Sequence, residues 1–408
     1  MKNLITFLIS CLSMTALLAQ VKNDSHIEVL ASSKAETTLR LTLEGVDLQK
    51  VATPRGEAVL PVFKNGKPLL EAGSPDVPKW AGALMIPETG GMAVEIVSSR
   101  FEEIEGVDVA PSKGDLKRTV DPSKVPFRYG EAYEANKFFP GKLADLQQPF
   151  VLRAARGQAV WMYPVQYNPA RRVLRVYSEI TVRVFANGEK GENELPTDRP
   201  ELGRSRVFED IYEQAFLNFD DKFLARGGGS DIEKMLVVAA DNLLPELENW
   251  VTWKKQSGLA VTVVPVSEIG SAQSAVIYNY VKDKYLAEGI SYLMLVGDDA
   301  AINPEMRADG ALYSCDNCFG YMDGNDHLPE ILVGRLNAAT PAQLRIMVNR
   351  ILEYEKNPLV DADQNWCATG MASTSAEGAG IGDDNQADYE HGNEWKAKQL
   401  ADGFEKYW

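Results

Sequence analysis

The amino-acid sequence predicts a multidomain chain, in which a β-rich sandwich is followed by an α/β domain with a Rossmann-like, mainly parallel sheet. Its 408 residues, 45% hydrophobic and 25% charged, can form the cores of about two or three domains. Short runs of alternating hydrophobic and polar residues fill the first half, as in strands with one buried face. Continuous apolar runs alternate with helical patterns in the second half, as in parallel sheets covered by helices.

Residues 1–20 have the pattern of a secretory signal peptide. Lys2 precedes an apolar stretch that ends in small residues, so we expect cleavage near Ala19 and an exported product. Cys11 offers an alternative, a lipid-attachment site, but the apolar residues that follow it indicate that the hydrophobic stretch is still running. No later segment is long and apolar enough to cross a bilayer.

The net charge of −16 argues against a nucleic-acid partner, because phosphate binding needs a clustered basic face and the sequence shows none. Three cysteines follow the signal peptide, Cys315, Cys318 and Cys367, which are too few for a disulfide framework. The spacing of Cys315 and Cys318 is that of half a zinc site, but no second pair follows. A local disulfide or two free thiols are the alternatives that we favour for this pair.

Residues 21–226 form the predicted β-rich domain. Alternation with a period of two is clearest at 38–43, 92–97 and 173–184, and turn residues separate these runs. Residues 227–408 form the predicted α/β domain, which follows a run of three glycines. Its expected strands are 235–240, 259–266, 292–296, 331–333 and one that starts at Trp366; its expected helices are 243–257, 272–287, one capped by Thr340 with Gln343, and 393–404.

Functional groups in such sheets collect beyond the carboxyl ends of the strands. Asp298 stands at one of these ends, as either a site residue or a cap of the next turn. The domain lacks a GxGxxG or Walker phosphate loop, so a nucleotide cofactor is poorly supported. That absence also disfavours a flavodoxin-like enzyme.

An acidic loop precedes the strand at 331–333. Asp323, Asn325, Asp326 and Glu330 supply oxygen donors that one loop could fold around a calcium ion, which takes about six to eight oxygen ligands. The loop is not an EF-hand, because His327 and Leu328 occupy positions where that motif needs other residues. A solvated turn before a strand is the alternative.

Several motifs of the second half resemble the catalytic domain of the gingipain-type cysteine peptidases. They are WVTWKKQSGL at 250–259, LVGD at 295–298, GNDHLPEILVGR at 324–335 and ILEYEKNP at 351–358. The β-rich half, with YPVQYNP at 163–169 and ITVRV at 180–184, is similar to the propeptide domain of that family. The resemblance implies a β-rich propeptide sandwich, a caspase-like catalytic domain and a cysteine endopeptidase precursor secreted by a Gram-negative bacterium. Its partners would be protein or peptide substrates, with its own propeptide as a possible inhibitor.

The resemblance also implies site residues. It assigns structural calcium to side-chain oxygens of Asp298, Asp326 and Glu330 and to carbonyls of Asp323 and Leu328. It assigns a second calcium site to Gln386 and His391, although a glutamate is usual where Gln386 stands. Asp388 matches the pocket aspartate of arginine-specific members, which implies a preference for arginine or another basic residue before the cut. Read from the sequence alone, Asp388 is an acid at a helix start.

The resemblance implies a catalytic histidine in a Gly-His-Gly segment and a nucleophile in a Cys-x-Asn-Gly segment. Neither occurs in residues 1–408, so we expect the dyad beyond Trp408, a truncated catalytic domain and an inactive 408-residue chain. Cys367 stands in an expected strand and is better explained as an apolar filler than as a nucleophile. Arg226, before the glycines, is either a processing site or part of an ordinary linker. The competing function is a non-catalytic secreted calcium-binding or adhesion module.

Overall fold

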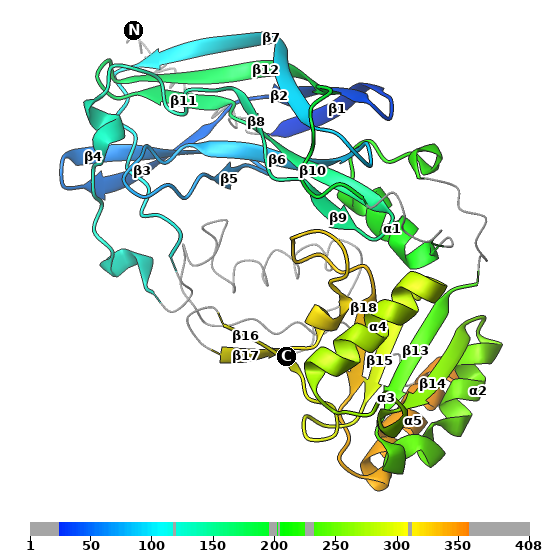
Figure 1. Cartoon of the computed structure of the whole chain (residues 1–408). Coiled ribbons are helices and arrows are strands. Elements are labelled where there is room, and N and C mark those ends of the chain that lie inside the picture. Colours follow the sequence, from blue (N-terminus) through cyan, green and yellow to red (C-terminus); the bar gives the residue numbers. More distant parts are fainter. Residues whose placement is uncertain are drawn as a thin grey trace, which may run out of the picture.

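The computed structural model describes residues 24–116, 120–195, 202, 205–224, 232–308 and 312–358. The predicted signal peptide, Arg226, Cys367, the strand at Trp366 and the helix at 393–404 lie outside these ranges. Within them the chain forms two regions, a β-rich one and an α/β one (Figure 1).

Two antiparallel sheets build the β-rich region. The first has the strand order β1-β2-β12-β11, and β7 pairs with the other edge of β12; its strands are β1 (Ser25–Ser32), β2 (Glu36–Leu43), β7 (Met92–Glu105), β11 (Val165–Asn168) and β12 (Val173–Ala186). The second has the order β5-β6-β10-β8, and β9 also pairs with β10; its strands are β5 (Lys67–Pro68), β6 (Pro78–Ile86), β8 (Ala144–Leu146), β9 (Phe150–Leu152) and β10 (Ala155–Met162). A separate hairpin joins β3 (Asp47–Thr53) and β4 (Gly56–Val62).

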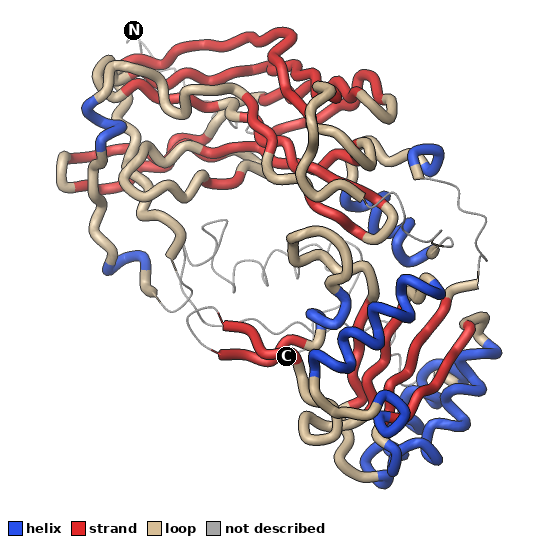
Figure 2. The backbone as a smooth tube through the Cα atoms, viewed as in Figure 1, coloured by secondary structure: helices blue, strands red, loops and turns tan. Residues whose placement is uncertain are grey.

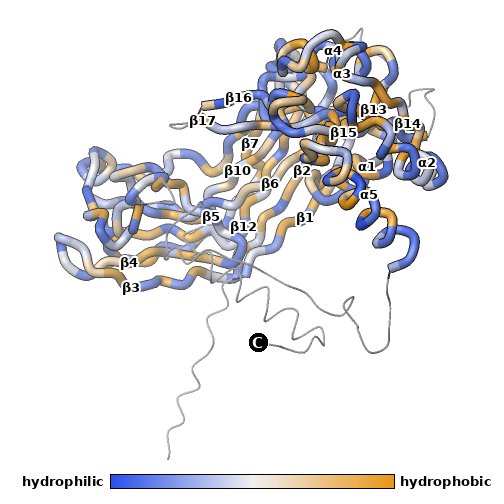
Figure 3. The backbone as a smooth tube through the Cα atoms, turned by 90° about the horizontal axis from the view of Figure 1, so that it is seen from below, coloured by the Kyte–Doolittle hydropathy of each residue, from blue (hydrophilic) through white to orange (hydrophobic). Residues whose placement is uncertain are grey.

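The two sheets share one core, which confirms a β-rich sandwich. Leu41 of β2 and Val182 of β12 belong to the same buried cluster as Leu84 of β6 and Met162 of β10. Every second residue of β2 is buried, so its predicted alternation is the alternation between core and outer face. Figure 3 shows hydrophobic and hydrophilic residues alternating along these strands.

The β-rich region also carries a helix that the sequence reading missed, α1 (Arg206–Ala215). Phe208 and Tyr212 are buried on one face of it, four residues apart, and Phe216 continues the stripe. The described part of this region also contains three short 3₁₀ turns, η1 (Pro122–Lys124), η2 (Glu131–Glu134) and η3 (Asp221–Phe223). Figure 1 shows α1 beside β9, at the junction with the second region.

A parallel four-stranded sheet forms the centre of the second region (Figure 2). Its order is β14-β13-β15-β18, with β13 (Lys234–Ala239), β14 (Ala260–Pro265), β15 (Tyr292–Val296) and β18 (Leu332–Leu336). Alternate residues of β13 face two different helix layers. Leu236 and Val238 pack with α4 (Ser274–Glu288), while Val237 and Ala239 pack with α2 (Glu248–Gln256) and α5 (Pro341–Lys356). The sheet therefore has helices on both faces, as predicted.

The ends of these helices follow local sequence signals. Thr340 and Gln343 form the predicted capping box of α5, and Gly289 ends α4 in a left-handed conformation at φ 66°. The predicted helix at 243–257 instead starts as a 3₁₀ turn, η4 (Asp241–Leu247). This turn contains Pro245, whose ring would clash with the carbonyl four residues earlier in an α-helix. Elements that were not predicted are α3 (Val266–Ile269), β16 (Glu305–Ala308), β17 (Leu312–Cys315) and η5 (Asn317–Gly320). Among the described helices, none has the length and hydrophobicity needed to cross a membrane.

Candidate functional site

The predicted acidic loop connects η5 to β18 at the amino end of the parallel sheet. The N–H of Glu330 donates to the carbonyl of Gly320 over 2.9 Å and closes the loop at its base. Gly324 has φ +79°, a conformation that residues with a Cβ atom rarely adopt. The loop is therefore a fixed turn, and its carboxylates point to defined partners.

Glu330 is the buried carboxylate of this loop, with 0% of its surface exposed. Its Oε2 accepts hydrogen bonds from the backbone N–H groups of Met322 (2.7 Å) and Asp323 (3.1 Å). Burial raises the pKa of Glu330 to about 8, and these two hydrogen bonds oppose that rise without cancelling it. Such a group needs either a proton or a nearby positive charge.

The other two carboxylates of the loop are also engaged. Asp326 accepts the N–H of Leu328 at Oδ1 (2.9 Å) and the N–H of Val151 at Oδ2 (2.8 Å). Asp323 accepts the hydroxyl of Tyr285 over 3.1 Å. Val151 belongs to β9, so the β-rich region contacts this loop directly.

The structure brings four of the predicted calcium ligands into this loop: Asp323, Asp326, Leu328 and Glu330. Asp298 does not join them. Strands β15 and β18 are parallel, Asp298 follows the carboxyl end of β15, and Glu330 precedes the amino end of β18. Asp298 and Glu330 thus lie at opposite ends of the sheet. Gln386, Asp388, His391 and Arg226 lie outside the described residues.

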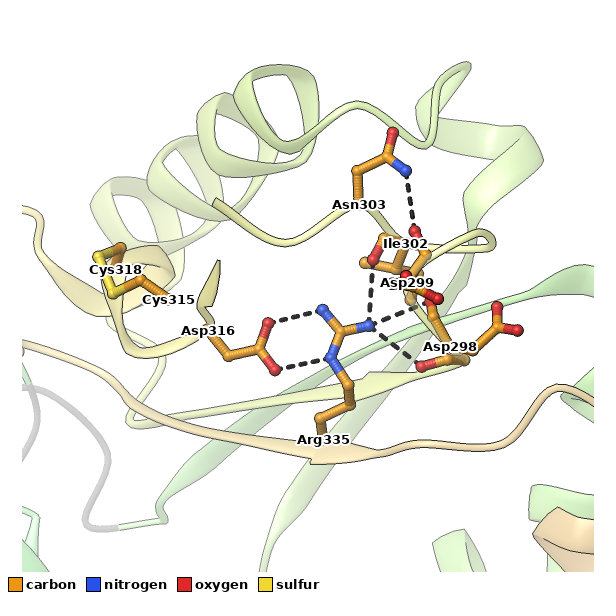
Figure 4. A network of polar contacts seen from close by, with 9 residues as sticks. Asp298, Asp299, Ile302, Asn303, Cys315, Asp316, Cys318 and Arg335 are labelled. Atoms are coloured by element: carbon orange, nitrogen blue, oxygen red, sulfur yellow. Dashed lines mark hydrogen bonds and ion pairs between the residues drawn. A yellow bond between two sulfur atoms is a disulfide. The ribbon is translucent and has the colours of Figure 1, made fainter. Parts of the chain in front are cut away.

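At its own end of the sheet, Asp298 caps a turn. Its Oδ1 accepts the N–H of Ala301 over 3.0 Å, the alternative role that the sequence left open. Beside it, Arg335 of β18 forms a bidentate pair with Asp316, with both N···O distances at 2.7 Å (Figure 4). The Nη1 atom of Arg335 also donates to the carbonyls of Gly297, Asp298 and Ile302.

Cys315 and Cys318 form a disulfide beside Asp316 (Figure 4), so of the two alternatives, a disulfide or two free thiols, the structure shows the disulfide.

The sequence motif at 324–335 ends at Arg335, and this motif was the one sequence signal that could have identified Arg335. Asp316, the partner of Arg335, lies 19 residues earlier and outside that motif, so no sequence motif identified it.

Within the described ranges, no group of three or more His, Cys, Asp and Glu side chains is placed to hold a metal ion. The acidic loop supplies only oxygen donors, the chemistry that calcium prefers. In the described arrangement, backbone N–H groups and a tyrosine hydroxyl satisfy those oxygens.

Comparison with known proteins places both regions in one family. The family model Propeptide_C25 matches residues 19–225, and the model of Peptidase family C25 matches residues 230–408. Gingipain R1 of Porphyromonas gingivalis is 34% identical over 382 residues, which are 92% of this chain and 37% of that protein. Lys-gingipain HG66 of the same organism is 30% identical over 332 residues, which are 78% of this chain and 19% of that protein.

A solved complex of the pro- and mature domains of Porphyromonas gingivalis RgpB matches 48% of this chain and 98% of the compared chain. Its sequence identity is 37% and its TM-score is 0.44. The sequence matches cover 37% of Gingipain R1 and 19% of Lys-gingipain HG66, so the chain spans less than half the length of each. Because the two family models follow one another along nearly the whole sequence, the chain belongs to peptidase family C25, with a propeptide region before a peptidase region.

Proposed function

We propose that the chain is the precursor of a gingipain-like cysteine endopeptidase that hydrolyses proteins or peptides. The observation that carries this proposal is the order of the two family regions, a propeptide region directly followed by a peptidase region. The contact between Val151 of the first region and Asp326 of the second supports it, because an inhibitory propeptide has to hold its own peptidase. A caspase-like fold for the complete peptidase domain is part of the proposal.

Export belongs to the same proposal. The signal-peptide pattern of residues 1–20 supports secretion or display at the cell surface. The named gingipains come from Porphyromonas gingivalis, which supports a Gram-negative source.

The proposed specificity is for arginine or another basic residue before the cut. The chain matches Gingipain R1 over 382 residues and Lys-gingipain HG66 over 332, at 34% and 30% identity. The carboxylate of Asp388 would pair with a guanidinium group. Arg226, at the end of the propeptide region, would then be a cleavage point for the peptidase itself.

The proposed cofactor is a structural calcium ion at the acidic loop. Asp326 and Glu330 would bind it through their carboxylates, and Asp323 and Leu328 through their carbonyls. The buried Glu330, whose pKa burial raises, is the kind of group that a divalent cation would compensate. The ion would neutralise the loop and would take no part in the reaction. Gln386 and His391 would belong to a second site.

The test uses the product of the complete gene, purified with calcium, on arginyl and lysyl amide substrates. We expect faster hydrolysis of the arginyl substrate, loss of activity on thiol alkylation, and loss of the arginine preference in Asp388→Asn. Asp298→Asn is the matched control and should keep the preference. A complete product that is inert with calcium present would overturn the proposal in favour of a non-catalytic calcium-binding or adhesion module.

A further inference from the structure

The turn between β9 and β10 inserts an arginine into the peptidase region. Arg153 lies in this two-residue turn, because Leu152 pairs with Ala155 across the hairpin. Its surface is 2% exposed, which makes it one of the largest fully buried side chains of the described chain. A buried arginine at the tip of a hairpin needs a partner surface, and the contacts of its guanidinium group identify that surface.

Within the described residues, the guanidinium group of Arg153 donates hydrogen bonds to the peptidase region. Nη1 donates to the carbonyls of Ile290 (2.9 Å) and Glu330 (3.0 Å). Nη2 donates to the carbonyl of Gly289 (3.1 Å) and the hydroxyl of Ser291 (3.0 Å). Gly289 and Ile290 follow α4 directly, so the cation lies at the negative end of that helix dipole.

The backbone of Arg153 is in the left-handed region, with φ 49°. Glycine is the residue that this conformation favours, and an arginine there is strained. Strain of this kind persists where the side chain has a role that outweighs it. The buried guanidinium contacts supply that role.

The β-rich region holds the tip of the hairpin ready for this contact. Tyr212 of α1 accepts the N–H of Ala154 (3.0 Å) and donates to the carbonyl of Leu152 (3.1 Å). The ring of Phe208 lies 5.0 Å from the Arg153 guanidinium carbon. Helix α1, which belongs to the propeptide region, therefore contacts both the backbone of the turn and the Arg153 side chain.

Further contacts surround the anchor. Asn193 of the propeptide region accepts the N–H of Asn325 (3.0 Å). The side chains of Leu328 and Leu332 pack against the cluster around α1 and β9. Together with the bond between Val151 and Asp326, these contacts form a polar and apolar rim around one buried cation.

We propose that Arg153 is the anchor by which the propeptide docks on its peptidase, in a site formed by the end of α4 and the acidic loop. The partner of this surface is the β9–β10 turn of the same chain, first within the precursor and then as a separate fragment after processing. The inference rests on the proposed precursor function, and it names the residue that controls how tightly the propeptide is held.

The experiment uses the full chain with a specific protease site placed at 227–230, cut after folding. The two fragments of the cut chain should stay together on dilution, and Arg153→Gly should raise their dissociation constant at least tenfold, or about 1.4 kcal/mol. Glycine suits the positive φ, so this variant removes the side chain without straining the turn. Arg172→Gly is the matched control, because Arg172 also has a positive φ, 54°, but bonds to Asp108 of its own region.

Equal dissociation constants for Arg153→Gly and the unaltered cut chain would overturn the proposal, as would an equal loss in Arg172→Gly. Ser291→Ala provides a second measurement that does not depend on the hairpin's own stability. Ser291→Ala should raise the dissociation constant of the fragments less in the Arg153→Gly background than in the unaltered chain, if the two side chains contact each other. Additive effects of the two substitutions would contradict the contact. Neither measurement involves peptide hydrolysis, so an inert protein that still shows anchoring would contradict the proposed function alone.

Discussion

The backbone N–H of Val151 and the Oδ2 atom of Asp326 are 2.8 Å apart, although 175 residues separate them in the chain. The hydrogen bond joins the propeptide region to the acidic loop of the peptidase region. It gives the carboxylate of Asp326 a partner, and it gives the outer edge of β9 an acceptor. The charge of the loop is thus part of the interface between the two regions.

Gly324 should contribute to the stability of this interface. A Cβ atom at Gly324 would lie 2.7 Å from Oδ2 of Asp326 and 3.3 Å from the side chain of Val151. We expect Gly324→Ala to lower the free energy of unfolding by about 2 kcal/mol, from backbone strain and the loss of one hydrogen bond. Gly258→Ala is the control, since Gly258 has φ +98° with no atom within 4 Å of its Cβ position, and should cost about 1 kcal/mol. Equal losses in urea unfolding of the two variants would contradict the close approach.

Glu330 should make stability depend on pH in metal-free buffer. Its folded-state pKa of about 8 exceeds the value of about 4.3 in an unfolded chain, so the folded protein retains a proton that the unfolded chain has lost. The free energy of unfolding should therefore fall as pH rises from about 4 to about 8, and this contribution should level off at higher pH. Urea unfolding of Glu330→Gln should lack this component; an unchanged slope would refute the assignment.

Calcium should stabilise the chain through the acidic loop. At a concentration about 100 times its dissociation constant, a ligand of the folded state adds about 2.7 kcal/mol to the free energy of unfolding. We expect Asp326→Asn to reduce this gain and Asp298→Asn to keep it, because Asp298 lies at the opposite end of the sheet. Thermal melts of each variant, with calcium and with a chelator, measure how much calcium stabilises it. An equal loss in Asp298→Asn would place Asp298 among the ligands.

Arg335 should stabilise the carboxyl end of the sheet. Its side chain is 11% exposed and binds Asp316 and three carbonyls, so we expect Arg335→Ala to cost about 3 kcal/mol in unfolding free energy. Arg345→Ala is the matched control, because Arg345 also pairs with a carboxylate, Glu246, but is 60% exposed. Its loss should stay below about 1 kcal/mol. Similar costs for both variants would contradict the structural role of Arg335.

Local signals in the sequence were sufficient for most elements of the second region. Apolar runs located the four parallel strands, and Thr340 with Gln343 located the start of α5. The missed elements show where such signals fail. Helix α1 lies in a region of strands, where its stripe of Phe208 and Tyr212 was not separated from β alternation. Hairpin β16–β17 is short, and its exposed side chains give it no hydrophobic period.

The site was predicted only in part, because its partners are distant in sequence. Composition located the carboxylates of Asp323, Asp326 and Glu330, and the structure confirms that they share one loop. The family resemblance assigns Asp298 to the same calcium site, but Asp298 follows the carboxyl end of β15 and the acidic loop precedes the amino end of the parallel strand β18. Arg153 carried no usable signal, since its burial depends on a surface more than 100 residues further along the chain.

Hydrogen exchange at the amide of Val151 in the full chain tests the docking of the two regions most directly. This N–H donates to Asp326 across the interface, so its protection reports the contact itself. We predict slow exchange in the unaltered chain and fast exchange in Asp326→Ala, with the amide of Val160 in β10 protected in both. Fast exchange of Val151 in the unaltered chain, with Val160 still protected, would show that the propeptide hairpin does not dock on the acidic loop.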